Sequence, residues 1–168
     1  MLVVKSDIDG KGKRLVTTQA IKKDEVVYAL KNYEVITSPT YTSVQISQTQ
    51  SIEEFPHIAH LNHSCAPNVI IDTMTMEIRA ARDIAADEDL NFFYPSTEWD
   101  MSSPFVCLCG SSNCLRIMAG AKHLSLNVLS EYFLNRHIGI MALECLTRLN
   151  RSEPEQLSAK LVTQSLLH

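Results

Sequence analysis

The segment Asn62-His63-Ser64-Cys65-Ala66-Pro67-Asn68 is the most informative stretch of the 168-residue sequence. Its proline and asparagine residues restrict the backbone and favour a turn, with a cysteine in the middle of it. Three more cysteines crowd together downstream, in Cys107-Leu108-Cys109-Gly110-Ser111-Ser112-Asn113-Cys114. Cysteines separated by one residue form a disulfide with difficulty, whereas both thiolates can bind one tetrahedral ion. The spacing therefore predicts a metal site.

The fourth ligand of such a site has to come from outside the cysteine cluster. Cys145 lies within an apolar helical pattern, so we interpret it as a small buried hydrophobic residue. The predicted ligands are then Cys65, Cys107, Cys109 and Cys114. Four thiolates leave no open coordination position, so the expected ion is a structural zinc. Free thiols in a reducing compartment are the alternative that the cysteine pattern alone leaves open.

The composition is that of one compact domain, with 45% apolar and 20% charged residues and a net charge of -4. An acidic chain argues against a nucleic-acid binder, whose surface usually carries a basic stripe. No apolar run approaches the roughly 18 to 20 residues of a membrane span, and residues 1–7 lack the features of a signal peptide. We therefore expect no nucleic acid or membrane among the partners, and a cytoplasmic location, or a nuclear one in a eukaryote.

The secondary-structure signals change in kind along the chain. They are short and β-type as far as about Tyr94 and become helical after about Ser125, so the predicted fold is mainly β with C-terminal helices. Strands of ordinary length are expected at residues 2–5, 14–17, 25–30, 41–47, 68–72, 76–81 and 89–92.

One internal similarity links two distant parts of the β-rich region. The outline of residues 18–27 recurs at residues 81–90, where an isoleucine (Ile21, Ile84) precedes a polar turn and a strand that begins with an acid. This predicts a pseudo-symmetric pair of β-units, with chance similarity as the alternative at this length.

The tail carries apolar residues at helical spacing. They are Leu126, Leu129, Tyr132, Phe133, Ile138, Met141, Ala142, Cys145 and Leu149. Ser152-Glu153-Pro154-Glu155 is typical of a capping box that opens a last helix, in which Leu157, Leu161 and Val162 would be buried. We expect this tail to dock against the domain, with homodimerisation as the alternative, so that a monomer and a homodimer both stay open.

The turn around Cys65, the downstream Leu90-Asn91-Phe92-Phe93-Tyr94 and the cysteine cluster together resemble the SET-domain methyltransferases with a post-SET zinc module. The likeness runs from about Lys5 to Met118. It implies a SET-domain β-clip fold in which the segments at residues 62–68 and at Tyr94 pass each other in a pseudoknot. The chain would divide into a SET domain (1–100), a post-SET zinc-binding segment (101–120) and a C-terminal helical tail (121–168).

The resemblance also implies a cofactor, S-adenosyl-L-methionine. The turn Gly10-Lys11-Gly12-Lys13-Arg14-Leu15 is similar to the first cofactor-binding turn of the family. Backbone groups of Lys11, Gly12 and Lys13 would hold the methionine part, and Asn62 and His63 the other polar edges. In the family, cysteines equivalent to the four predicted here hold the zinc ion, which agrees with the ligand set chosen above.

Tyr94 matches the active-site tyrosine of the family and would orient the acceptor amine and the methyl group through its hydroxyl. A tyrosine that packs at a strand end is the alternative from its chemistry alone. We expect Phe92 and Phe93 in the substrate channel, although both are equally compatible with ordinary packing. Phe92 holds the position that often tunes how many methyl groups fit, and without a hydroxyl it favours multiple methylation. His63 is expected to make structural hydrogen bonds rather than to act as a base.

Several departures from the family pattern bear on peptide recognition. About 34 residues separate Val27 from Asn62, so the insert that usually walls the peptide groove must be small. Ala59 stands where an arginine is common, and Phe93 stands where an acid is usual. No separate cysteine cluster precedes the domain. These changes leave the cofactor and zinc motifs in place.

The expected activity is therefore protein-lysine N-methylation, with the capacity for multiple methylation. The alternative is small-molecule methylation, for example O-methylation of a small carboxylic acid. A third hypothesis is a catalytically silent binding module. A carboxylate acceptor is already ionised at neutral pH but needs a positive pocket. The candidates to supply this positive charge are His57, His60, Arg14 and Arg79.

Overall fold

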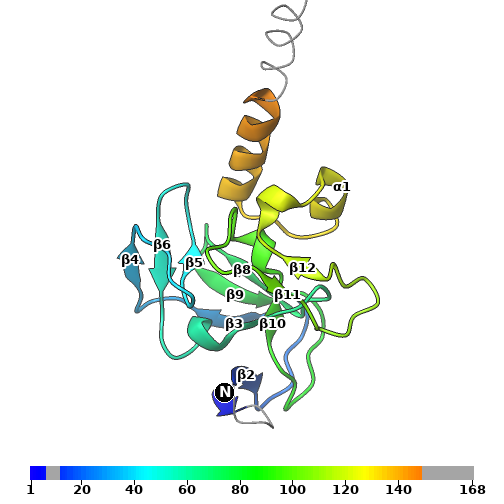
Figure 1. Cartoon of the computed structure of the whole chain (residues 1–168). Coiled ribbons are helices and arrows are strands. Elements are labelled where there is room, and N and C mark those ends of the chain that lie inside the picture. The colour runs from blue at the N-terminus through cyan, green and yellow to red at the C-terminus, as the bar shows by residue number, and fades with distance from the viewer. Residues whose placement is uncertain (7–11, 149–168) are drawn as a thin grey trace, which may run out of the picture.

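The structure, a computed structural model, describes residues 1–6 and 12–148. Within these residues, short strands make up most of the regular structure and helices gather at the C-terminal end (Figure 1). The predicted class, mainly β with C-terminal helices, is confirmed. No helix in the described ranges is long and apolar enough to cross a membrane.

The strands form five small sheets. One pairs β1 (Leu2–Ser6) with β2 (Lys13–Thr17), and another has the order β3 (Val26–Ala29), β9 (Glu77–Ala80) and β8 (Val69–Asp72). The third has the order β4 (Glu34–Ile36), β6 (Ser51–Glu53) and β5 (Val44–Gln45). The remaining two pair β7 (Asn62–His63) with β10 (Asn91–Phe92) and β11 (Phe105–Val106) with β12 (Ile117–Met118). Only the pairing of β7 with β10 is parallel among these described strands.

Four short helices and one longer helix complete the described chain. The short ones are η1 (Ile58–His60), η2 (Tyr94–Ser96), η3 (Ala121–His123) and α1 (Leu126–Leu129). The longer one occupies residues 136–148 and projects from the body of the domain in Figure 1.

Most predicted strands are present, and the missed ones are very short. The strand expected at 41–47 is reduced to β5, Val44–Gln45. The sequence pattern does not predict β4, β6, β7, β11 and β12, each of which has only two or three residues. Strands of this length are defined by the partner strand rather than by local preference.

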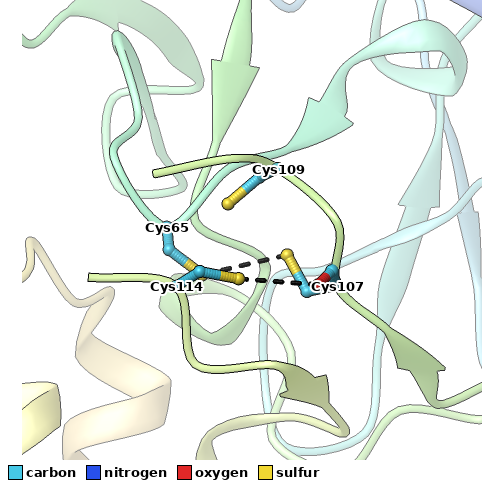
Figure 2. Close-up of side chains that lie close together, drawn as sticks. All are labelled: Cys65, Cys107, Cys109 and Cys114. Carbon is cyan, nitrogen blue, oxygen red and sulfur yellow. Dashed lines mark hydrogen bonds between the residues drawn. The ribbon is translucent and has the colours of Figure 1, made fainter. Parts of the chain in front are cut away.

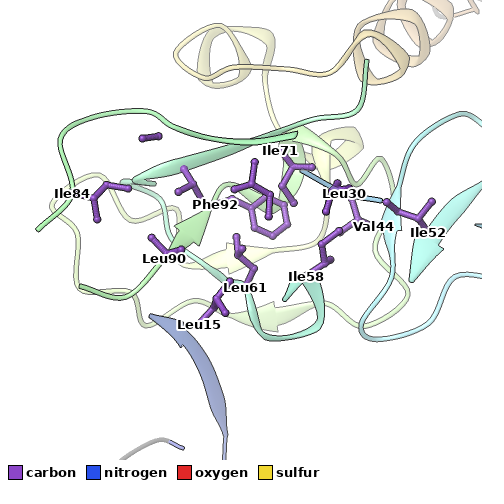
Figure 3. Packing of buried hydrophobic residues seen from close by; sticks show 13 residues of the cluster. Leu15, Leu30, Val44, Ile52, Ile58, Leu61, Ile71, Ile84, Leu90 and Phe92 are labelled. Carbon is purple, nitrogen blue, oxygen red and sulfur yellow. The ribbon is translucent and has the colours of Figure 1, made fainter. Parts of the chain in front are cut away.

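The main core lies between the sheets and is apolar throughout (Figure 3). Ile71 on β8 and Ile78 on β9 lie directly opposite each other and are fully buried. Burying one such side chain stabilises the fold by about 1.5–3 kcal/mol. Phe92, on β10, belongs to the same cluster. The core therefore fixes the strand that ends just before Tyr94.

A second buried cluster joins the segment after β10 to the tail. Its members are Cys65, Phe93, Cys107, Met118, Ala121, Leu129 and Ile138. It draws on residues far apart in the sequence, and three of its larger apolar members come from the last third of the chain.

The two similar segments pair with each other. Ile21 and Ile84 form an antiparallel bridge in which each N–H donates to the other carbonyl at 2.9 Å. In each turn the glutamate that begins the next segment accepts a hydrogen bond from the backbone N–H three residues earlier, at 2.8 and 2.9 Å. Asp24 and Asp87 both have a left-handed backbone, with φ of 68° and 64°. The predicted pseudo-symmetric pair is confirmed at this turn.

In the described part of the tail, burial in the domain is greatest up to Ile138. Ile138 is fully buried, and the His137 ring donates from Nε2 to the carbonyl of Thr97 at 2.8 Å. Further along the described helix Met141 and Ala142 are half-buried, while Ile140, Leu143 and Leu146 are exposed, Leu143 to 66%. Cys145, expected to be buried, is only half-buried. The predicted capping box at 152–155, the last helix and Leu149 lie outside the described residues.

Candidate functional site

The site is built where β7 and β10 run side by side. The two strands are parallel, with Asn62 opposite Asn91 and His63 opposite Phe92. Beyond the strands, the Ser64 N–H donates to the Phe92 carbonyl at 3.0 Å. The two segments that the family resemblance expects to meet do therefore lie against each other.

Tyr94 lies two residues after the end of β10, and its side chain is largely enclosed. Its hydroxyl donates to the Leu61 carbonyl at 3.2 Å. The ring lies 4.8 Å from Phe92, 5.2 Å from His63 and 6.0 Å from Phe105, measured between ring centroids. Burial raises the pKa of Tyr94 well above its usual value, so the hydroxyl keeps its proton at neutral pH. Tyr94 is thus a fixed hydrogen-bond donor rather than a base.

His63 connects Tyr94 to the cysteine cluster. The backbone N–H of Tyr94 donates to His63 Nδ1 at 3.3 Å, which places the ring proton on Nε2. That nitrogen lies 3.3 Å from Cys65 Sγ. Burial lowers the pKa of His63 to about 4, so the ring is neutral at pH 7. These bonds match the structural role expected for His63.

A single cavity of about 530 Å³ brings most of the predicted residues together. Asn62, His63, Phe92 and Tyr94 all line it. Its volume is within the range of about 300–1,000 Å³ that is usual for small-molecule sites. Its remaining walls come from residues 39–44, from Ile58, Ala59 and Leu61, and from most of the segments 98–103 and 105–109, the second of which leads into the cysteine cluster.

The described part of the predicted cofactor-binding turn, which begins at Gly12, is linked to this cavity through Asn62. The side-chain amide of Asn62 donates to the Lys13 carbonyl at 3.0 Å, which ties the turn to β7. Gly12 is half-buried, and neither Gly12 nor Lys13 is among the residues that line the cavity. Lys11 lies outside the described residues.

Phe93 does not fit its predicted place in the substrate channel. It is fully enclosed in the second cluster, where its ring stacks on Tyr132 at 3.7 Å with an angle of 7° between the ring planes. Neighbouring residues of an extended segment point to opposite faces, so Phe92 faces the cavity and Phe93 faces away. The packing alternative is the correct one for Phe93.

The four predicted metal ligands come together (Figure 2). The sulfur atoms of Cys65, Cys107, Cys109 and Cys114 all lie within 4.8 Å of one another, and Cys65 and Cys107 are 3.9 Å apart. A disulfide needs about 2.05 Å, whereas sulfurs bound to one tetrahedral zinc at about 2.3 Å are separated by nearly 4 Å. The geometry fits a four-thiolate metal centre and excludes a disulfide.

The surroundings of Cys65 favour a bound thiolate. The Leu115 N–H donates to its sulfur at 3.4 Å, while Asn113 and Tyr132 each hold its carbonyl at 2.9 Å. Burial raises the pKa of the Cys65 thiol to about 12, so a cation is needed to hold it as a thiolate at neutral pH. A divalent metal ion would supply that charge.

Glu98 is a cavity residue that the sequence did not point to. Its Oε1 accepts hydrogen bonds from the Gln45 N–H at 2.8 Å and from the Thr97 hydroxyl at 3.1 Å. Burial raises the pKa of Glu98 to about 7. The only signal near Glu98 in the sequence is its position four residues after Tyr94, and Asp100 follows so closely that this position does not single out Glu98.

The cavity is otherwise short of charge. Asp100 also lines it but is exposed and paired with Lys122 at 2.6 Å and with His123 at 2.8 Å. No lysine or arginine is among the described residues that line the cavity. Its net character is therefore acidic.

Residues 12–95, half of the chain, match the SET domain family. The chain belongs to the SET domain family. A relative from Aspergillus flavus, named Methyltransferase flvH, is 48% identical over 101 residues, which cover 59% of this chain and 57% of that protein. A histone-lysine N-methyltransferase of Candida albicans, H3 lysine-36 specific, is 29% identical over 86 residues, or 48% of this chain and 10% of that protein. The chain thus spans little more than half of the first relative and a tenth of the second.

The fold agrees with that assignment to the SET domain family. The crystal structure of KRYPTONITE in complex with mCHH DNA, an H3(1-15) peptide and SAH superposes with a TM-score of 0.51 at 18% identity. The superposition covers 69% of this chain and 29% of that one. At this identity it supports the SET-like fold alone.

Proposed function

We propose that this protein is an S-adenosylmethionine-dependent N-methyltransferase whose principal acceptor is a lysine side chain of a protein. The observation that carries the proposal is the enclosed hydroxyl of Tyr94 in one cavity with Asn62 and His63. Membership of the SET domain family and two relatives named as methyltransferases support it.

The cavity has the size and the polar groups that the cofactor needs. Asn62 and His63 line it, and the carbonyl of Lys13 lies against the Asn62 amide. We assign these residues, together with Gly12 and Lys11, to cofactor binding. S-adenosylmethionine supplies an electrophilic methyl carbon on a positively charged sulfur.

Tyr94 is the residue that we assign to orientation of the reacting atoms. Transfer from a sulfonium is an in-line displacement, so the site has to hold the nucleophile about 3 Å from the methyl carbon. The Tyr94 hydroxyl is anchored on the Leu61 carbonyl and stays protonated. Its oxygen lone pairs remain available to the acceptor nitrogen.

The apolar walls suit an amine acceptor. A lysine with an unperturbed pKa near 10.4 has to lose its proton before it can attack. Phe92 and Phe105 beside Tyr94 make a poorly solvating wall, which disfavours the ammonium form. Phe92 also has no hydroxyl to hold a water in the space of an added methyl group, which supports multiple methylation.

We propose a structural zinc ion at the four cysteines. Cys107 and Cys109 line the cavity as well as reaching the predicted metal centre. The ion would fix the course of residues 105–109 and with it one wall of the cavity. Its role would be to shape the site, since four thiolates leave no position for a substrate.

A small-molecule amine is the second candidate acceptor. Residues 39–44 line the cavity, so the short insert that follows β4 forms one wall of an enclosed space rather than a long groove. The relative from Aspergillus flavus is named only as a methyltransferase. That name specifies no acceptor, so the wall formed by residues 39–44 is the observation that favours a compact acceptor.

A carboxylate acceptor is poorly supported by the charge of the cavity. None of the four side chains considered as cationic suppliers lines it: Arg14, His57, His60 and Arg79. Arg14 is paired with Asp89, and Arg79 lies 2.6 Å from Glu77. An acidic cavity would repel a carboxylate.

The test is transfer of labelled methyl from S-adenosylmethionine to two pools, cell protein and the low-molecular-weight extract, with Tyr94→Phe as the control. Base-stable label in protein is the expected result and means N-methylation of a side chain. Base-stable label only in small molecules would identify the second candidate. Label released by base as methanol would mean a carboxyl ester and would contradict the proposal.

A further inference from the structure

We infer that Glu98 receives the acceptor nitrogen as an ammonium ion and takes its proton before methyl transfer. This inference rests on the proposed N-methyltransferase function and adds a residue to it. It starts from the one carboxylate of the described cavity wall that has no cationic partner.

The backbone of Glu98 is fixed on both sides. Its N–H donates to the Tyr94 carbonyl at 2.9 Å, and its own carbonyl accepts from the Ala121 N–H at 2.9 Å. Glu98 therefore belongs to the same tight turn as Tyr94. The carboxylate and the phenol are presented to the cavity from one rigid element.

The side chain is held through one oxygen only. Oε1 accepts from the Gln45 N–H and from the Thr97 hydroxyl, and Gln45 is itself fixed by the Trp99 N–H at 3.0 Å. Oε2 makes no hydrogen bond to any described residue. An ionised carboxylate has about four acceptor sites, so Glu98 has free capacity on the oxygen that is not held.

No cation compensates the charge of Glu98, because no lysine or arginine is among the described residues that line the cavity. The Tyr94 phenol keeps its proton, and the ring of His137, packed behind Thr97, has its pKa lowered by burial. Asp100 is paired with the cation Lys122. Burying an anion that has no cationic partner costs free energy, and a cation that enters the cavity reduces that cost.

The chemistry of the acceptor supplies such a cation. The ammonium N–H⁺ bond breaks and the proton moves to Oε2, giving a neutral amine and a protonated Glu98. The amine lone pair then forms the N–C bond to the methyl carbon as the C–S bond breaks, and the electron pair of that bond stays on sulfur. Glu98 returns its proton to water. For a further methylation, the product ammonium can give its proton to Glu98 in the same way.

The decisive variant is Glu98→Gln, because its amide oxygen can keep both hydrogen bonds while the charge and the basic oxygen are lost. Initial rates are measured at pH 7 and pH 9.5, on the pool that the wild-type protein labels in base-stable form. Glu77→Gln is the matched control, because Glu77 pairs with Arg79 and is not part of the cavity wall. Titration with S-adenosylhomocysteine checks that the cofactor site is intact.

We expect Glu98→Gln to lower the rate at pH 7 by about a hundredfold, within the range of general-base contributions. The deficit should shrink to below about tenfold at pH 9.5, where far more of the amine is already neutral in solution. The control should stay within about twofold of wild type. A Glu98→Gln rate within twofold at pH 7, or an equal loss at both pH values, would overturn the inference, since a structural role does not depend on the protonation of the acceptor.

A second pair of variants covers a folding failure of Glu98→Gln. Glu98→Asp keeps a carboxylate, and Glu98→Asn has the shape of that shorter side chain without its charge. At pH 7, Glu98→Asp should therefore be faster than Glu98→Asn by about tenfold or more. Equal rates would contradict the inference. If wild type labels an amine and the Glu98 variants match it, only this inference fails. If wild type forms base-labile esters, or labels neither pool, the proposed function fails and the inference fails with it.

Discussion

Two regions of the molecule meet at the cavity, and different forces hold them. The region before Tyr94 rests on the main core, where side chains such as Ile71 and Ile78 are completely removed from water. The region of residues 105–118 has short strands, β11 and β12, and its outer residues are exposed, as Leu108 is at 83%. Four sulfur atoms gather at its centre. Apolar burial stabilises the first wall, and we expect the second to depend on the proposed metal ion as well.

The largest expected effect comes from removing the proposed zinc ion. Analysis of the purified protein should find about one zinc per chain, and chelation or Cys65→Ala should abolish methyl transfer. Hydrogen exchange should then rise sharply in residues 105–118 but stay slow in β8 and β9. Protein that holds no zinc in reducing buffer, or keeps it in Cys65→Ala, would rule out the four-cysteine centre.

Loss of the Tyr94 hydroxyl should come next in size. Tyr94→Phe keeps the ring contacts with Phe92 and His63 and removes only the oxygen that orients the acceptor. We expect a fall in kcat of about a hundredfold or more, with little change in S-adenosylhomocysteine affinity. Steady-state rates and calorimetry measure the two quantities. An unchanged kcat would mean that Tyr94 only packs against its neighbours and does not orient the acceptor.

The tail offers a matched pair of changes on one helix. Ile138 is fully buried and Leu143 is 66% exposed. Ile138→Ala should therefore lower the free energy of unfolding by about 2–5 kcal/mol, and Leu143→Ala by less than about 0.5 kcal/mol. Urea denaturation of the zinc-loaded protein gives both values. Equal losses at the two positions would show that the outer part of the helix is also covered, as in a homodimer.

The smallest expected effect is a pH-dependent gain in stability. Burial raises the pKa of Glu98 to about 7 from an unfolded value near 4.5, so the folded protein binds more protons between these values. The stability contributed by protonated Glu98 is complete below about pH 4.5 and is lost as the pH rises through 7. Glu98→Gln should therefore raise the melting temperature by a few degrees at pH 8 and much less at pH 5. A gain of the same size at both pH values would contradict this sign.

The parts of the site that the sequence predicted are those carried by local motifs. The turn around Cys65, the spacing of the three later cysteines and Tyr94 at the end of a strand are all visible in a few consecutive residues. The structure places these features together, and the metal-ligand geometry is the one that the spacing favours. The bridge between Ile21 and Ile84 was also visible, because the same turn pattern occurs twice.

The parts that the sequence missed depend on distant partners. Glu98 is held by Gln45, which is 53 positions away, so nothing near Glu98 marks it. Phe93 is an exception, because its orientation follows from a local rule. Neighbouring residues of an extended segment point to opposite faces, so Phe92 and Phe93 could not both face the substrate channel. The apolar periodicity of the tail predicted a helix correctly but could not say how much of it another surface covers, and Leu143 shows the difference.

The most direct test of the central claim, that one cavity built from both regions binds the cofactor, is calorimetry with S-adenosylhomocysteine. Asn62→Ala changes the wall from β7, and Phe105→Ala changes the wall from β11. We predict one bound molecule per chain and an affinity about tenfold weaker in each variant. No binding by the zinc-loaded wild-type protein, or full affinity in either variant, would contradict the account.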